Sequence, residues 1–163
     1  MYSDILKKEL QFDDSGHERL NAYRLAFRLA MEIFEMSKKF PKEEMYSLTD
    51  QVRRSSRSVC ANIGEGYRKR PYPKSFISKM IDVDGEATET TVHIRFAHDC
   101  GYISKEDHNY FKAEYLLVGK MINGMIQHPE KFTPGHSVTA TATATATATV
   151  TTTLPETKSK DSK

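Results

Sequence analysis

Apolar residues recur at steps of three and four along four stretches of the chain, the spacing that puts side chains on one face of an α-helix. The first stretch follows Ser15 and reaches Lys39, with apolar positions at Leu20, Tyr23, Ala26, Phe27, Ala30, Ile33 and Phe34. Ser15 and Glu18 have the spacing of a capping box, and Pro41 cannot continue a helix. We therefore expect an amphipathic helix that begins near Ser15 and ends before Pro41.

The second stretch runs from Leu48 to Arg70, and its stripe is Leu48, Val52, Val59, Ile63 and Tyr67. Ser47 and Asp50 offer a weaker capping box at its start, and Pro71 must end it. At about 100° per residue, Arg54, Arg57 and Arg68 fall opposite the stripe, with Arg53 on the flank. This helix is expected to bury one side and to show guanidinium groups on the other.

Two further helices are predicted after it. The third begins at Pro73, whose missing N–H is no loss there, and ends near Cys100 before Gly101. Ser104 and Asp107 open the fourth, which ends before Pro129. The expected buried positions are Phe76, Met80, Val83, Ala87, Thr91 and Ile94 in the third, and Tyr110, Leu117, Met121 and Met125 in the fourth.

Short loops between helices of about 20 residues make consecutive helices antiparallel neighbours. The pattern thus predicts an all-α protein, an up-down-up-down antiparallel four-helix bundle over residues 15–130. Residues 1–14 are polar and are expected to form a loosely held leader. Within residues 131–163, positions 139–149 alternate strictly between Thr and Ala. Such a segment buries too little to offset its ordering entropy, so we expect a disordered tail.

Composition indicates the cellular compartment of the protein. No apolar run approaches the roughly 18 residues that span a bilayer, and the N-terminus lacks the apolar region of a signal peptide. The two cysteines, Cys60 and Cys100, lie within helical patterns without metal-type spacing. We expect a soluble cytoplasmic protein with reduced, buried thiols and no contact with membranes.

The net charge of +2 conceals a basic segment. Residues 38–79 carry eleven Lys and Arg against four acidic residues, so the remainder is net acidic. Such clustering favours phosphate contacts, since guanidinium groups bind phosphate in a bidentate way and release counterions. The candidate nucleic-acid-binding residues are Arg53, Arg54, Arg57, Arg68, Lys69, Arg70 and Lys74.

Aromatic and acidic residues modify this hypothesis. Tyr67 and Tyr72 are near enough to stack on an unpaired base. Asp50 and Glu65 lie on the same outer face and dilute its charge, and Glu65 is spaced to pair with Arg68. The arginines could instead serve contacts between subunits, and this alternative stays open.

The sequence contains no residue pattern typical of a catalytic site. Asp82, Glu86, Glu89 and His93 share a face of the third helix, but that face is opposite its apolar stripe, and the Glu-x-x-His pairs of a di-metal bundle are absent. We expect a solvated or intersubunit face there. Asn62 and His98 are expected to form hydrogen bonds within the bundle. No nucleophile, phosphate-binding glycine loop, metal site or cofactor is predicted, so the protein is expected not to be an enzyme.

The segment FPKEEMYSLTDQVRRSSRSVCANIGEGYRKR, residues 40–70, resembles the four-helix-bundle proteins associated with 23S rRNA intervening sequences. The family pattern runs FPKEE, then LT-Q-RR, then Ser-Ile-Pro-Asn-Ile-Ala/Gly-Glu-Gly. Gly85, Glu86 and Glu89, and DCGYIS at residues 99–104, are also similar, so the resemblance covers roughly residues 18–128. Cys60 stands where many relatives have proline, which implies a straighter helix. Asp84 stands where a basic residue is common, which weakens any basic groove that includes the third helix.

The resemblance implies a homo-oligomer, because related bundles form pentameric rings. A related branch serves as the accessory protein of diversity-generating retroelements, where it is thought to bind nucleic acid and a reverse transcriptase. Most of the family has no assigned function. We therefore expect a non-enzymatic, self-associating bundle that binds RNA or DNA through its second helix. The alternative is an oligomeric scaffold for another protein, such as a reverse transcriptase, with the arginines between subunits.

Overall fold

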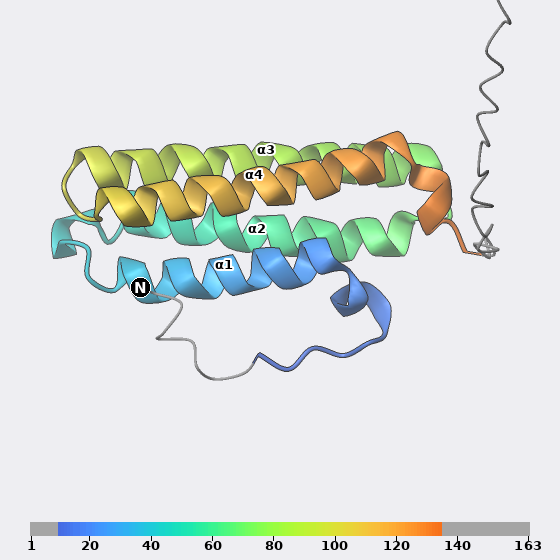
Figure 1. The fold of residues 1–163 in the computed structure, drawn as a ribbon, viewed down its shortest axis with the longest axis horizontal. Helices are drawn as coiled ribbons and strands as arrows, with labels where there is room; N and C mark the ends of the chain where they lie inside the picture. The colour runs from blue at the N-terminus through green and yellow to red at the C-terminus, as the bar shows by residue number, and fades with distance from the viewer. Residues whose placement is uncertain (1–9, 135–163) are drawn as a thin grey trace, which may run out of the picture.

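The computed structural model describes residues 10–134, which contain four long α-helices (Figure 1). These are α1 (Asn21–Ser37), α2 (Leu48–Lys69), α3 (Pro73–Asp99) and α4 (Lys105–Gln127). Short 3-10 helices, Gly16–Arg19, Lys42–Glu44 and Pro129–Phe132, flank them. Successive long helices run in opposite directions, so the predicted all-α, up-down-up-down antiparallel bundle is confirmed. Leader residues 1–9, and residues 135–163 of the expected tail, lie outside the described residues.

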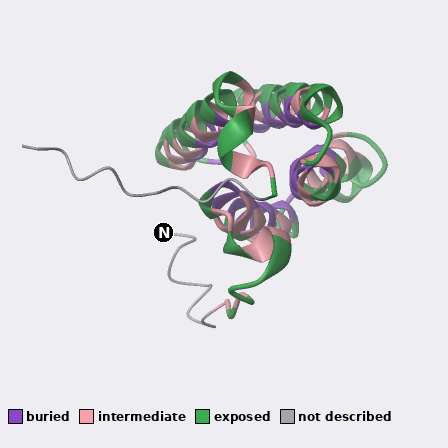
Figure 2. Cartoon of the chain, turned by 90° about the vertical axis from the view of Figure 1, so that its right-hand side faces the viewer, coloured by how far each residue is buried: buried purple, intermediate pink, exposed green. Residues whose placement is uncertain are grey.

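The helices form a ring in which each contacts two neighbours. Packing is most extensive between α2 and α3, while α1 also contacts α2 and α4, and α3 contacts α4. The buried sides face one another across the bundle axis (Figure 2). The largest fully buried apolar side chains come from every helix: Leu29, Ile33, Met36, Val52, Val59, Ile63, Met80, Val83, Ile94, Phe111 and Ile122. Burial of this apolar surface is the main stabilising contribution to the fold.

Several helix ends follow the sequence signals. Pro73 occupies the first turn of α3, where its missing N–H is harmless. Gly101 has a φ of 78° after α3, and its N–H donates to the carbonyl of His98 at 2.9 Å. Ser104 caps α4 by accepting a hydrogen bond of 3.0 Å from the N–H of Asp107. Local chemistry therefore places these three boundaries.

Both other capping boxes are wrong. Ser15 makes no side-chain capping hydrogen bond at the 3-10 helix Gly16–Arg19, and the Glu18 carboxylate instead accepts from the N–H of Asp13 at 2.9 Å. Helix α1 accordingly begins later than expected. At α2, the Ser47 hydroxyl donates to the Glu44 carboxylate and makes no capping hydrogen bond with the N–H of Asp50.

The predicted buried stripes are partly wrong in register. On α4 the buried residues are Phe111, Tyr115, Val118, Ile122 and Met125, whereas Leu117 is exposed. Helix α4 is apolar on more than one side, so periodicity alone does not select the side that meets α1 and α3.

Polar positions on α3 and in the loop after it also depart from expectation. Thr90 is buried in place of Thr91, and its hydroxyl donates to the hydroxyl of Ser55 on α2 at 2.9 Å. His98 was expected inside the bundle but is partly exposed, with Nδ1 2.8 Å from the Asp99 carboxylate. Cys60 is buried as expected, but Cys100 is exposed. The burial of these side chains depends on contacts with neighbouring helices and loops, which the spacing of apolar residues does not reveal.

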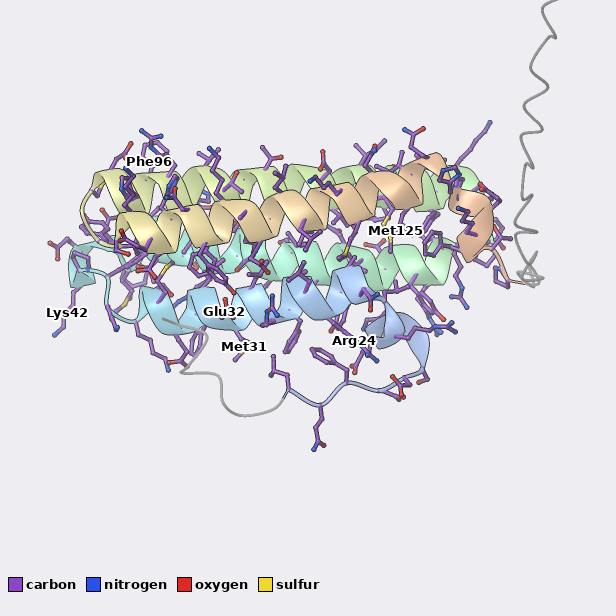
Figure 3. All side chains as sticks on the ribbon, in the orientation of Figure 1. Arg24, Met31, Glu32, Lys42, Phe96 and Met125 are labelled. Carbon is purple, nitrogen blue, oxygen red and sulfur yellow. The ribbon has the colours of Figure 1, made fainter. Side chains whose placement is uncertain are left out.

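Residues 10–14 of the expected leader pack beside α1. The ring of Phe12 meets the edges of Tyr23 and Phe27 at centroid distances of 6.4 and 5.8 Å. Arg24, labelled in Figure 3, donates from Nε to the carbonyl of Glu18 at 2.6 Å and pairs with Asp14 at 2.6 Å. This part of the leader is therefore held against the first helix.

Candidate nucleic-acid interface

The outer face of α2 carries the predicted arginines as the helical spacing requires. Arg54, Arg57 and Arg68 are exposed, and Arg53 is half-buried at the flank that faces α1. Val52, Val59 and Ile63 on the opposite side are fully buried, which fixes how the helix is rotated. Within residues 10–134, Arg57 and Arg68 form no ion pair. Their donors remain available to a ligand.

Phe34 of α1 supports the arginines on that flank. The guanidinium carbon of Arg53 lies 5.0 Å from the centre of the Phe34 ring, and that of Arg57 lies 5.7 Å away. Arg53 also donates from Nε to the Ser37 hydroxyl at 2.7 Å. A guanidinium group resting on a ring is attracted by its π-system and still has N–H groups at its edge. Two arginines are thus positioned before any ligand arrives.

A groove of 550 Å³ lies along this part of α2. We refer to it as the arginine groove, and it is lined by Met45, Tyr46, Thr49, Asp50, Arg53, Arg54, Arg57, Ser58 and Ala61. Three of these residues are arginines and one is acidic. The groove therefore combines positive charge with the exposed aromatic ring of Tyr46 and a single carboxylate.

Arg68 and Lys69 lie at the far end of α2, about 16–18 Å along the helix from Arg57, followed by Arg70 at its C-cap and by Lys74 on α3. Lys69 pairs with Glu65 at 2.6 Å, and Lys79 of α3 pairs with the same carboxylate at 2.9 Å. Hydrogen bonds from Lys69 and then Lys79 lower the pKa of Glu65. Arg70 folds over the Tyr67 ring, 3.7 Å from its centre. Basic side chains at this end of α2 are thus partly engaged in ion pairs and a cation–π contact within the protein.

Acidic residues of α3 border the interface on the other side. Glu89 lies 3.9 Å from Arg54 and 3.3 Å from His93, and Asp82 pairs with Lys79 at 3.1 Å. Among residues 10–134, no three His, Cys, Asp or Glu side chains are grouped to hold a metal ion. The α3 edge of α2 is therefore mixed in charge, and the edge towards α1 is the more basic one.

The structure changes which aromatic residues matter. Tyr67, one of the two predicted stacking residues, is half-buried beneath Arg70, and Tyr72 is exposed but lies at the far end of α2. Sequence reasoning missed Tyr46 and Phe34, which lie beside the arginines. Tyr46 stands two residues before the predicted helix, in a polar turn. This position was the only feature of the sequence that indicated an exposed ring. Phe34 looked like a core residue of the first helix.

A second surface feature lies on α3 and α4. Most of the exposed large apolar side chains of the described residues are on these two helices: Ile81, Val92, Phe96, Leu116 and Leu117. Phe96 stands on the outer side of α3 (Figure 3) and is 57% exposed. A groove of 470 Å³ between the helices includes Val92, Ile94 and Leu116 in its lining. We refer to this surface as the α3–α4 face.

The comparisons with known proteins agree with the fold. A family model described as 23S rRNA-intervening sequence protein matches residues 18–124. A crystal structure of a Bacteroides thetaiotaomicron protein of unknown function, from the S23 ribosomal protein family, superposes with a TM-score of 0.59. It is 22% identical and covers 65% of this chain and 95% of that chain, a likeness that shows the fold alone. No curated protein matches the chain. Over residues 10–134, no helix is long and apolar enough to cross a membrane.

Proposed function

The chain belongs to the 23S rRNA-intervening sequence protein family, and we propose that it binds nucleic acid through the outer face of α2 without catalysing a reaction. The observation that carries the proposal is the pair Arg53 and Arg57, held on the Phe34 ring at the arginine groove. Guanidinium groups arranged in advance lose less side-chain entropy when they bind phosphate. Arg54 and Arg68 extend the same surface, and Lys69, Arg70 and Lys74 add charge at its far end.

The test is fluorescence anisotropy of labelled RNA and DNA titrated with the full chain at two salt concentrations. Saturable binding should weaken with salt, by roughly 0.7–0.9 logarithmic units per tenfold rise in salt for each phosphate contact. Replacing Arg54, Arg57 and Arg68 together by Glu should abolish binding. These side chains are exposed, so the bundle should keep its helical circular dichroism.

A matched control changes the same charge elsewhere. Lys105, Lys120 and Lys131 are exposed, lie off the outer face of α2, and can be replaced together by Glu. This control should retain most of the affinity, because losing local contacts costs more than changing total charge. Equal affinity in the arginine variant and the wild type would overturn the proposal. Wild type that binds no nucleic acid even at low salt would do the same.

We also propose that the protein self-associates, and the α3–α4 face is the observation that favours this second role. Apolar patches on a protein surface mark interaction sites, and these apolar residues belong to α3 and α4, whereas the candidate arginines belong to α2. Self-association through this face would leave the outer face of α2 open to nucleic acid. A scaffold for another protein is the alternative use of the same apolar surface.

Light scattering of the full chain tests self-association. Wild type should have the mass of an oligomer, for which the family resemblance suggests a pentamer. Val92→Lys with Leu116→Lys should lower that mass, whereas Met45→Lys, an exposed apolar site elsewhere, should not. A monomeric wild type would refute self-association. A lower mass in the Arg54, Arg57 and Arg68 variant would assign those arginines to subunit contacts instead.

Both cysteines are free thiols, which supports a proposed reducing, cytoplasmic compartment.

A further inference from the structure

Tyr46 is the most exposed of the exposed large apolar and aromatic residues in the described chain, with 92% of its surface accessible. It lies between the 3-10 helix Lys42–Glu44 and α2, beside Met45, which is 50% exposed. Its ring makes no aromatic or cation–π contact within residues 10–134. An uncovered tyrosine ring presents a flat apolar face with a polar end, which suits a planar partner.

The Tyr46 ring lies next to basic side chains. It lines the arginine groove together with Arg53, Arg54 and Arg57. Arg53 and Arg57 are one helical turn apart, about 6 Å along the axis, so both can contact one phosphate backbone that follows the groove. The groove thus holds a stacking surface and several phosphate-binding groups within reach of one short segment.

Asp50 adds a different property. A carboxylate is acceptor-only and repels phosphate, so it adds nothing to a surface that binds only a sugar-phosphate backbone. It can accept hydrogen bonds from the exocyclic amino group of an unpaired base. Its presence beside Tyr46 and the arginines therefore fits a groove that holds both a base and its flanking phosphates.

From these contacts we propose that the arginine groove binds single-stranded nucleic acid, with one unpaired base stacked on Tyr46 and its flanking phosphates on Arg53, Arg54 and Arg57. This inference rests on the proposed function and specifies its ligand. Inside a duplex, each base face is covered by its neighbours and cannot stack on a side chain. The arginines alone would accept either strand form, and Tyr46 supplies the preference.

The experiment compares a labelled single-stranded RNA of 12 nucleotides with the blunt duplex of the same sequence, by anisotropy with the full chain. Wild type should bind the single strand more tightly. Tyr46→Ala should weaken single-strand binding by roughly 5- to 150-fold, the range found when one stacking residue is removed, and should leave duplex binding unchanged. Because Tyr46 is almost fully exposed, this change does not disturb the core.

Two variants separate stacking from other effects. Tyr46→Phe keeps the ring and should retain single-strand affinity. Tyr72→Ala removes a tyrosine that is 69% exposed outside the groove, and it should weaken single-strand binding less than Tyr46→Ala does; an equal loss would overturn the assignment of the stacked base to Tyr46.

Failure of this inference differs from failure of the proposed function. If the arginine variant loses binding while Tyr46→Ala matches wild type, the stacking proposal is wrong and the phosphate-binding surface stands. Equal affinity of wild type for single strand and duplex would also overturn it. If wild type binds neither these RNAs nor the labelled DNA of the first test, the proposed function fails together with it.

Discussion

The phenol of Tyr110 on α4 donates a hydrogen bond of 2.8 Å to the carboxylate of Glu32 on α1. Glu32 is only 1% exposed, which makes it the most deeply buried acidic side chain of the described residues. Arg28 approaches the same carboxylate at 3.8 Å and pairs with Glu114 at 2.6 Å. One buried carboxylate therefore links α1 to α4.

Burial raises the pKa of Glu32, against the opposing influence of Tyr110 and Arg28. The folded protein thus keeps this proton to higher pH than the unfolded chain, whose ordinary value is 4.5. Below 4.5 both states are protonated, and as pH rises through the raised pKa the free energy of unfolding should fall. We expect Glu32→Gln to remove this fall and to stabilise the protein at pH 7 by about 1 kcal/mol.

Urea unfolding of both proteins between pH 4 and 8 measures this difference. Glu106→Gln, which changes an exposed carboxylate on α4, serves as the control and should leave the pH profile unaltered. A Glu32→Gln protein that is less stable than wild type at pH 7 would show that the ionised carboxylate contributes net stability.

Gly66 of α2 packs closely against α3. A Cβ atom at this position would overlap the Cε of Met80 and would lie 3.3 Å from the Cβ of Lys79. Met80 is fully buried, so its displacement would disturb the core. Overpacking costs about 1–3 kcal/mol, which should outweigh the gain in helix propensity of about 1 kcal/mol and lower the thermal midpoint of Gly66→Ala.

Gly85→Ala is the matched control for that change. Gly85 lies within α3, and a Cβ there meets nothing within 4 Å. Gly85→Ala should therefore gain helix propensity without any overpacking, and its thermal unfolding midpoint should rise. Calorimetry on both variants gives opposite signs if the two helices pack as described, and an increase for Gly66→Ala would contradict this packing.

The two cysteines should differ sharply in reactivity. Burial raises the pKa of the Cys60 thiol to about 12, and the group is shielded, whereas Cys100 is exposed. At pH 8 iodoacetamide should modify Cys100 more than roughly 100-fold faster than Cys60 in the folded protein. Mass spectrometry of the digested protein measures both rates, and Cys100→Ser should resist labelling until denaturant is added. Comparable rates at both sites would show that α2 opens readily.

Local sequence predicted the helices because their signals act over a few residues. Pro41 and Pro73 restrict the backbone around them, Gly101 adopts a positive φ, and Ser104 caps the adjacent turn. The exposure of Arg54 and Arg57 also followed, because a helix that buries Val52 and Val59 must turn those positions outwards. The fold class and the basic face were thus available from spacing alone.

Contacts between helices could not be predicted in the same way. Leu117 and Val118 are both apolar, and only the neighbouring helices decide that Val118 is buried and Leu117 is not. Glu44 holds the start of α2 through Leu48 and Ser47, and also accepts from the hydroxyl of Tyr102, which is distant in sequence. Which of two apolar faces of a helix becomes buried therefore depends on the neighbouring helices that pack against it.

The candidate site shows the same division. By itself the sequence determined that α2 is a helix with arginines opposite its apolar stripe, because helical periodicity fixes relative side-chain directions. Only the tertiary structure placed Phe34 of α1 beneath Arg53 and Arg57, and brought Tyr46 to the same groove. A cation–π contact and a groove both depend on distances between separate segments, and those distances exist only once the helices have packed.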